Sequence, residues 1–292
     1  MFQTEWEARR KLVEEALPVE LKAGGALDDT LAASMMYSLM AGGKRLRPVL
    51  LMAAADAAGG HGEDFLTTAC AMEMIHTYSL IHDDLPAMDN DDYRRGKLTN
   101  HKVYGAGMAL LAGDGLLTLA FEVILRQTGV SEKTRLEVAR EFAVAAGPAG
   151  MVGGQAIDLV SEGQRIDRAT LRKMHLGKTG ALFRAAIRAG AILAGAAPDT
   201  LAALTAYADA FGLAFQITDD ILDVVGDADQ IGKPVGSDEK NQKSTYVTLT
   251  SLEEAKRLAR QAVDEAVAAL APLGDEARFL RELAEFLISR QQ

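Results

Sequence analysis

Hydrophobic residues recur at three- and four-residue steps along most of the chain. The clearest stripe begins at Leu201 and ends at Val225, through Leu204, Ala208, Phe211, Phe215 and Leu222. This spacing predicts amphipathic helices. Similar patterns predict helices over residues 2–17, 27–40, 48–58, 63–85, 104–128, 132–146, 167–195, 252–271 and 275–289. No segment alternates with β-branched enrichment, so we expect no sheet.

Glycine pairs and isolated prolines mark the helix ends. They stand at Gly24-Gly25, Gly42-Gly43, Gly59-Gly60, Gly129 and Pro198, as helix-stop chemistry predicts. No linker, composition shift or repeat divides the chain. We therefore predict a single all-α domain over residues 1–292, with long, mostly antiparallel helices around a deep central cavity. The longest loop is expected over residues 226–245.

Two aspartate clusters each end an apolar helical run. The first contains Asp83, Asp84 and Asp89, and the second contains Asp219, Asp220 and Asp223. Carboxylates beside an apolar wall are costly unless a positive charge lies between them. Two such clusters facing each other would supply hard oxygen ligands, which suit Mg²⁺ carrying a phosphorylated substrate.

The spacing differs between the clusters. Asp219, Asp220 and Asp223 can share one face of a helix. Asp83 and Asp89 are six residues apart, but Pro86 predicts that the helix ends near Leu85 and that the chain curls back. An exposed acidic loop is the alternative for a single cluster, because neighbouring carboxylates in water repel by only ~1 kcal/mol. The occurrence of two clusters after apolar runs favours the metal site.

Composition excludes several classes of protein. The 292 residues are 49% hydrophobic and 25% charged, which predicts a large core rather than disorder. A net charge of −10 argues against a nucleic-acid partner. The single cysteine, Cys70, excludes an intrachain disulfide and a cysteine-based zinc site. The N-terminal residues lack a signal peptide, and the longest uncharged run, 142–157, is broken by glycines and a proline. We expect a cytoplasmic protein without a membrane span.

Cations gather at two other places. Gly42–Pro48 places Lys44 and Arg47 near a new helix start, where free N–H groups and positive charge could hold a pyrophosphate without metal; a solvated basic turn is the alternative. Arg94 and Arg95 follow the first cluster and either neutralise nearby acids or grip different phosphates. His76 lies two turns before Asp83 on the same face, as a ligand or as an ordinary core or surface histidine.

The segment Lys178-Thr179-Gly180 is predicted to interrupt a helix and to expose backbone carbonyls. Lys233 and Lys243 lie on and after the long loop, where they are either solvated or part of a lid. A calcium loop is excluded, because the sixth position from Asp89 is Arg94 where an EF-hand requires glycine. The chain also lacks a glycine-rich P-loop, which disfavours an ordinary NTPase.

These blocks together resemble the trans-isoprenyl diphosphate synthase family, in particular its bacterial-type farnesyl diphosphate synthases. The resemblance runs from about Gly42 to Thr248 and rests on Gly42–Pro48, Glu73–Gly96, Gly150–Leu159, Lys178–Gly180 and Phe215–Asp238. It implies the isoprenoid synthase fold, usually as a homodimer. It also implies condensation of an allylic diphosphate (dimethylallyl or geranyl) with isopentenyl diphosphate, which releases pyrophosphate.

The resemblance also assigns roles to individual residues. Mg²⁺, about three ions per site with Mn²⁺ as a possible substitute, would be held by Asp83, Asp84, Asp89, Asp219, Asp220 and Asp223. The allylic diphosphate would contact Arg94, Lys178, Thr179, Gln216, Lys233 and Lys243. Isopentenyl diphosphate would contact Lys44, Arg47, His76 and Arg95. Chain length would be set at Tyr78 and Ser79.

The implied chemistry matches these residue types. Metals and cations would stabilise the departing pyrophosphate, and carbonyls near Lys178 and Thr179, with the Gln216 side chain, would stabilise the allylic cation. Tyr78 lies five residues before Asp83, about 7.5 Å along the helix, where an aromatic ring would close the floor of the cavity. The tail, from Ser289 to Gln292, carries one basic residue where relatives often carry more, which puts its part in closing the site in doubt.

Three other readings remain open. A geranylgeranyl diphosphate synthase shares the fold and differs in the depth of its pocket. A terpene cyclase, which is a lyase, needs no isopentenyl site, so Gly42–Pro48 and the full second Asp cluster speak against it. A non-catalytic partner subunit need not keep both aspartate clusters, and this chain keeps both.

Overall fold

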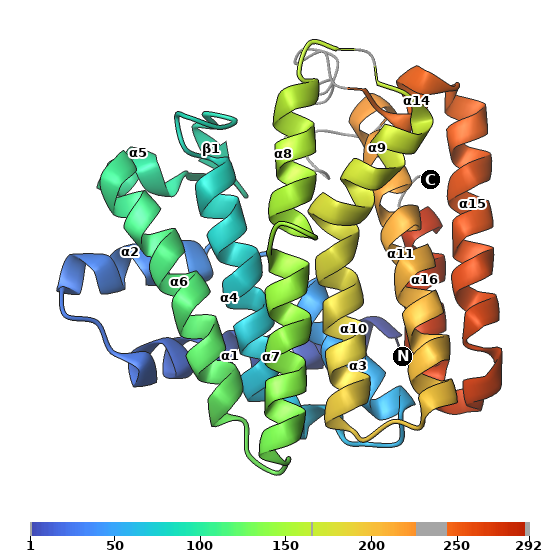
Figure 1. Ribbon diagram of the computed structural model, residues 1–292, viewed down its shortest axis with the longest axis horizontal. Helices are drawn as coiled ribbons and strands as arrows, with labels where there is room; N and C mark the ends of the chain where they lie inside the picture. The colour runs from blue at the N-terminus through green and yellow to red at the C-terminus, as the bar shows by residue number, and fades with distance from the viewer. Residues whose placement is uncertain (1, 165, 226–243, 290–292) are drawn as a thin grey trace.

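The computed structural model describes residues 2–164, 166–225 and 244–289, which are almost all helical (Figure 1). The helices are α1 (Phe2–Gly24), α2 (Asp29–Leu39), α3 (Leu46–Ala57), α4 (Leu66–Asp83), α5 (Asn100–Tyr104), α6 (Ala106–Arg126), α7 (Glu132–Ala146), α8 (Met151–Ser161), α9 (Arg168–His175), α10 (Ala181–Leu193), α11 (Pro198–Val225), α14 (Tyr246–Leu249), α15 (Leu252–Ala269) and α16 (Arg278–Ser289). Short 3₁₀ turns cover Gly62–Phe65 and Ala271–Ala277. The predicted all-α class is confirmed.

Long helices stand side by side through the molecule. α4 packs along α6, α3 against α10, and α11 against both α10 and α15. In Figure 1 the C-terminal ends of α4 and α11 point to the same end of the molecule, at the top of the view. Strand β1 follows α4 there, and α9 and α14 lie beside α11. Both aspartate clusters are therefore carried to one end of the helical layers.

Three apolar clusters hold the helices together. The first lies mainly between α1, α4, α6 and α7, and includes Leu17, Met72 and Phe142. The second lies between α3, α10, α11, α15 and α16, around Phe183 and Phe211. A smaller cluster joins α9, α11, α14 and α15. These clusters bury the apolar stripes that predicted the helices.

Helix bounds follow the hydrophobic pattern with a few differences. α1 continues to Gly24, with Pro18 inside it, and a separate α5 precedes α6 at Gly105, whose φ is 85°. The glycine-rich segment after α7 forms α8, a helix that the sequence pattern did not predict.

The expectation of no sheet was wrong at one place. Tyr93–Arg94 (β1) and Lys97–Leu98 (β2) pair antiparallel. Arg95 and Gly96 form the two-residue turn between them, with φ of 54° and 74°, as in the primed turns that match strand twist. The all-α class stands, because the hairpin is a small addition to the helices.

The helix containing Lys178 is widened rather than interrupted. Leu176–Gly180 forms a π-helical turn between α9 and α10, which corrects the predicted break. Close backbone approaches surround it: a Cβ on Gly154 of α8 would lie 2.0 Å from the Lys178 nitrogen, and one on Gly212 of α11 would lie 3.2 Å from the Cα of Gly180. Glycine therefore lets α8 and α11 press against this turn from two sides.

Three described helical segments are long and apolar enough to cross a membrane by length and composition alone. They are Ala106–Arg126, Glu132–Ser161 and Pro198–Val225. Between 33% and 44% of each apolar window is buried inside the protein. The uncharged run at 142–157 thus belongs to a longer apolar segment than the sequence reading allowed, and the absence of a membrane span stays a prediction.

Candidate active site

The first aspartate cluster lies on a turn that closes on itself. α4 ends at Asp83, and the Asp89 N–H donates to the Asp83 carbonyl at 2.9 Å. Leu85 accepts from the N–H groups of Met88 and Asn90, at 2.9 and 3.1 Å, which tightens the same turn. The predicted curl after α4 is confirmed, and it brings the backbone of Asp89 against that of Asp83.

Electrostatics at this turn favour a bound cation. Burial raises the pKa of Asp83 to about 6, Lys178 opposes this shift, and Asp89 adds to it. A carboxyl whose pKa is raised by burial and by neighbouring acids lacks sufficient positive charge nearby. All donors in the cluster are oxygens, which Mg²⁺ prefers. The donor set therefore fits a divalent cation.

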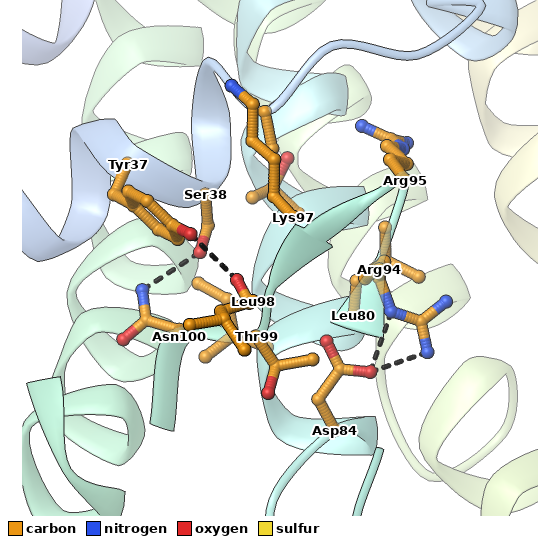
Figure 2. A pocket seen from close by; sticks show the side chains of 13 residues that line it. Tyr37, Ser38, Leu80, Asp84, Arg94, Arg95, Lys97, Leu98, Thr99 and Asn100 are labelled. Carbon is orange, nitrogen blue, oxygen red and sulfur yellow. Dashed lines mark hydrogen bonds and ion pairs between the residues drawn. The ribbon is translucent and has the colours of Figure 1, made fainter. Parts of the chain in front are cut away.

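Asp84, at 4% exposure, is paired with Arg94 (Figure 2). Its Oδ1 accepts a hydrogen bond from Arg94 Nε at 2.6 Å and forms an ion pair with Arg94 Nη2 at 2.5 Å. Arg94 also lies 3.5 Å from Asp91. Both contacts use Oδ1, so Oδ2 is the oxygen that would bind a metal, and the pairing places the Arg94 guanidinium at the acidic cluster.

The second cluster is built differently, on the last turns of a continuous α11. Asp219 and Asp223 are half-buried, whereas Asp220 is 3% exposed and faces the protein. Oδ2 of Asp220 accepts from the backbone N–H of Tyr246 at 2.8 Å, and Oδ1 accepts from Gln216 Nε2 at 3.2 Å. Asp220 thus joins α11 to the start of α14.

Lys178 lies between the two halves of the site. Its Nζ donates to Asp158 of α8 at 2.6 Å, and its charge lowers the pKa of Asp83 on α4. The half-buried Thr179 follows it on the π-helical turn. A π-turn, whose hydrogen bonds span five residues instead of four, occurs frequently at functional sites. Lys178, which the resemblance assigns to the allylic diphosphate, thus lies near the first cluster.

Two residues here were not assigned a role from sequence. Asp158, buried on α8, is the ion partner of Lys178, and His175 stacks on Tyr246 with ring centroids 5.8 Å apart. Burial lowers the pKa of His175 to about 4, and its Nε2 lies 3.7 Å from Asp220. The sequence offered a signal for each residue: Asp158 is a lone carboxylate among apolar residues and glycines, and His175 lies three residues before Lys178.

The cationic side chains of the basic turn before α3 differ in exposure and in their contacts. Arg45, with φ of 49° and 2% exposure, points inward, where it donates to Glu73 at 2.7 Å and to the Leu39 carbonyl at 2.8 Å. Lys44 is exposed, and its carbonyl accepts from Trp6. Arg45 therefore supports the fold, whereas Arg47, two residues later, lies against His76 instead.

Arg47, His76 and Arg95 come together as predicted. Arg47 Nη1 lies 3.3 Å from His76 Nε2, and its guanidinium covers the Phe183 ring at 4.4 Å. Burial lowers the pKa of Arg47 to about 10 and the pKa of His76 well below its usual value. Arginine has only donors, so a neutral His76 accepts from it. Among the described residues, Arg47 Nε has no hydrogen-bond partner.

Arg95 reaches this group from the hairpin. Its guanidinium donates to the Gly42 carbonyl and packs on Gly43, where a Cβ would meet it at 2.5 Å. Gly43 also has φ of 120°, so a side chain there would be both strained and blocked. The approach of Arg95 thus requires glycine at position 43. Together Arg47, His76 and Arg95 place several hydrogen-bond donors beside the basic turn.

The proposed chain-length residues lie on α4. Tyr78 is buried in the first apolar cluster, with its ring 5.6 Å from that of His82 in an edge-on arrangement. Burial, together with the charge of Asp83, raises its pKa to about 12. Ser79 donates to the His76 carbonyl at 2.8 Å. Tyr78 is thus a buried phenol about one and a half turns from Asp83, and its role as the floor of the cavity stays a prediction.

Some predicted site residues lie outside the described part of the chain, namely Lys233 and Lys243. The tail residues Arg290 to Gln292 also lie outside it. Within the described residues, no three Asp, Glu, His or Cys side chains gather into a ready metal site. Each aspartate cluster would therefore contribute a partial set of ligands.

Comparison with known proteins identifies the class of protein. Residues 28–278 match the model of the family described as "Polyprenyl synthetase". The chain belongs to this family and is a prenyltransferase.

Three relatives resemble the chain over 97% of its length. A dimethylallyltranstransferase from Fischerella ambigua is 51% identical and is covered over 82% of its own length. A geranylgeranyl diphosphate synthase from Cyanophora paradoxa is 46% identical, with 94% covered, and a farnesyl diphosphate synthase from Bacillus subtilis is 45% identical, with 96% covered.

A solved structure shares the fold. The apo crystal structure of a FPP/GFPP synthase from Zymomonas mobilis superposes with a TM-score of 0.88 at 38% identity, and 98% of each chain is covered. The isoprenoid synthase fold predicted from the sequence motifs is thereby confirmed.

Proposed function

We propose that this prenyltransferase condenses dimethylallyl and geranyl diphosphates with isopentenyl diphosphate to give farnesyl diphosphate. The observation that carries the proposal is that two adjacent arginines, Arg94 and Arg95, contact two different groups of residues. Arg94 pairs with Asp84 in the acidic cluster, whereas Arg95 lies on Gly42 and Gly43, beside Arg47 and His76. One hairpin thus serves two neighbouring anion sites, one suited to metal and one built from cations.

The acidic site would hold the allylic diphosphate. Mg²⁺ would be bound by Asp83, Asp84, Asp89, Asp219, Asp220 and Asp223, with Mn²⁺ as a substitute, and would neutralise charge on the leaving diphosphate. Arg94 and Lys178, which already lie at this cluster, would bind the same diphosphate. Lys233 and Lys243 complete the set as predictions from sequence.

The cationic site would hold isopentenyl diphosphate without metal. Half-buried Arg47 has a buried Nε–H without a hydrogen-bond partner among the described residues, and buried donors are costly unless a ligand satisfies them. His76, held neutral by burial and by the arginines, can donate from its other ring nitrogen. Lys44 and Arg95 supply further charge-assisted hydrogen bonds.

The chemistry follows from these two sites. The allylic C–O bond breaks, and its electron pair leaves with pyrophosphate, which Arg94 and Lys178 stabilise. The isopentenyl double bond attacks the allylic carbon and forms the new C–C bond. Backbone carbonyls of the π-turn near Lys178 and Thr179, with the Gln216 amide oxygen, stabilise the cation. Pyrophosphate then accepts the proton that restores a double bond, so no protein base is required.

Tyr78 is proposed as the floor that limits the product to fifteen carbons, with Ser79 beside it. The support is its burial on α4 close to Asp83. Tyr78→Ala should shift products toward twenty carbons or more in a folded enzyme, as chromatography of the dephosphorylated products would show. An active, folded variant with unchanged product length would place the floor elsewhere.

The direct test of function is product analysis with a panel of substrates. The protein, with Mg²⁺ and isopentenyl diphosphate, would be incubated with dimethylallyl, geranyl or farnesyl diphosphate. We expect rapid use of the first two and slow use of farnesyl diphosphate. Efficient use of farnesyl diphosphate would instead support the geranylgeranyl synthase alternative, and a cyclic hydrocarbon released without isopentenyl diphosphate would indicate a cyclase.

We also propose a cytoplasmic homodimer. Several apolar side chains of α6 are exposed, among them Leu110 (45%), Leu111 (54%) and Leu125 (50%). An exposed apolar row on a long helix is typical of an interface, and a second copy would cover it by packing its own α6 there. Light scattering should give twice the chain mass, and Leu111→Glu should shift it toward the monomer.

A further inference from the structure

The β1–β2 hairpin carries both proposed diphosphate-binding arginines, yet it has little structure of its own. Each strand has two residues, and Tyr93, Lys97 and Leu98 are exposed. An isolated two-stranded hairpin is marginally stable in water. Since Arg94 and Arg95 must keep a fixed separation to serve two anion sites, other parts of the molecule have to hold this hairpin.

The contacts that Arg94 and Arg95 make themselves are not enough to hold the hairpin, because their partners lie where substrate would bind. Arg94 pairs with Asp84, which is a proposed metal ligand, and Arg95 pairs with Gly42 beside the proposed isopentenyl site. Both partners belong to the region where substrate would bind. A diphosphate that binds there would therefore compete with Asp84 and Gly42 for the two guanidinium groups.

Helix α2 holds the hairpin from its other side (Figure 2). The Tyr37 hydroxyl donates to the Leu98 carbonyl at 2.7 Å. Asn100, two residues beyond β2's end, donates from Nδ2 to the Ser34 carbonyl at 2.9 Å and to Ser38 Oγ at 2.8 Å, and its Oδ1 accepts from Ser34 Oγ at 2.8 Å. No residue in this set is one that we place in the site.

The burial of these groups adds to their effect. Ser34 and Asn100 are fully buried, where a satisfied polar network fixes a unique arrangement and a broken one leaves unpaired groups. Tyr37, Ser38 and Asn100 line the same small pocket as Arg94 and Arg95, between α2, α4 and the hairpin. A displacement of β2 against α2 would therefore be transmitted to both guanidinium groups.

We infer that Tyr37 and Asn100 of the α2–hairpin contact are positioning residues, which set Arg94 and Arg95 for the two diphosphates. This inference rests on the proposed function. Neither residue touches substrate; each acts by holding β2, and thus the turn at Arg95, in place.

The test compares Tyr37→Phe with Tyr104→Phe. The two tyrosine rings contact each other at 5.7 Å, and only the Tyr37 hydroxyl bonds to the hairpin among the described contacts. Loss of one hydrogen bond corresponds to roughly a fivefold effect. We expect Tyr37→Phe to raise KM for both isopentenyl and geranyl diphosphate about three- to tenfold, with kcat within about twofold, and Tyr104→Phe to leave both constants unchanged.

A purely structural role would give a different result. It would lower the amount of active enzyme, and hence the apparent kcat, without changing either KM. Ser38→Ala, which removes one partner of Asn100 and leaves two, is the second variant should Tyr37→Phe fold poorly; its KM values should rise about two- to threefold. Unchanged KM values in folded variants would overturn the inference. If the wild-type protein makes no prenyl product, the proposed function fails instead.

Discussion

The ends of α4 and α11 carry nearly the same aspartate pattern, yet the backbone differs at the two clusters. At the end of α4 the helix stops, and a tight turn brings Asp89 back to Asp83. At the end of α11 the helix continues through Asp223, and Asp220 bonds to the backbone of α14. One cluster is shaped by the turn after a helix, and the other by contact with a neighbouring element.

The difference shows how similar sequences acquire different electrostatics. Asp84 finds its partner in a cation, Arg94, which is held by the hairpin. Asp220 accepts hydrogen bonds from a backbone N–H and an amide, which join α11 to α14 and to the preceding turn of α11. We therefore expect loss of an aspartate from either cluster to affect the chemistry, and loss of Asp220 to affect the fold as well.

The largest effect is expected from removing one carboxylate of either cluster. Asp83→Ala or Asp219→Ala should lower turnover by at least roughly 1,000-fold, because diphosphate leaves poorly without charge neutralisation. Asp92→Ala is a matched control, since its side chain pairs with Lys102 on the surface; it should stay within about twofold. Steady-state assays would measure all three. Near-normal turnover of either cluster variant would contradict the shared role of the clusters.

The structural difference between the clusters can be measured as stability. Asp220→Ala leaves the buried Tyr246 N–H without its acceptor, which should cost about 1–3 kcal/mol in the free energy of unfolding. Asp209→Ala on the same helix removes only an exposed pair with Arg184 and should cost less than about 1 kcal/mol. Urea denaturation would measure both. Equal losses would show that Asp220 does not support α14.

The second cluster also predicts a pH dependence through His175. Its imidazole has a folded pKa of about 4, lowered by burial, whereas the unfolded value is about 6.5. The unfolded state then binds more protons below pH 6.5, so stability is full above that pH and falls as the pH drops toward 4. At pH 5 the loss is about 2 kcal/mol.

Denaturation of the wild type and of His175→Gln at pH 7 and pH 5 isolates this contribution. The variant should lose about 2 kcal/mol less between the two pH values. Asp83, whose raised pKa acts in the opposite direction, is present in both proteins and cancels. Equal losses in the two proteins would mean that His175 is not held neutral by burial.

The smallest effect concerns the cationic site beside the first cluster. Arg47→Ala, or Lys44→Ala, should raise KM for isopentenyl diphosphate roughly tenfold and leave KM for geranyl diphosphate within about twofold. Steady-state kinetics with each substrate varied in turn would measure this. An equal change in both KM values would show that the two substrate sites are assigned wrongly.

Much of the fold could be predicted because apolar periodicity records which face of each helix is buried. The stripe along α11 predicted its position and type, and Pro86 predicted the turn that returns Asp89. α8 escaped prediction because glycines and a proline interrupt the uncharged run that contains it, although Gly154 serves the close approach to the π-turn at Lys178. Intrinsic preference was overridden there by packing between helices.

The site could be predicted by residue type but not by orientation. Arg45 and Arg47 stand two residues apart in one basic turn, yet the first is buried on Glu73 and the second faces His76. That choice depends on the left-handed backbone at Arg45, which no spacing rule indicates. The hairpin that separates Arg94 from Arg95 is likewise fixed by contacts with α2, which lies more than fifty residues earlier in the chain.

The central claim is that two aspartate clusters use Mg²⁺ to transfer a prenyl group, and metal removal tests it most directly. With geranyl and isopentenyl diphosphates, the wild-type protein should form farnesyl diphosphate in Mg²⁺, stop in excess EDTA, and recover when Mg²⁺ is restored. Turnover that continues at a near-normal rate in EDTA would contradict the account.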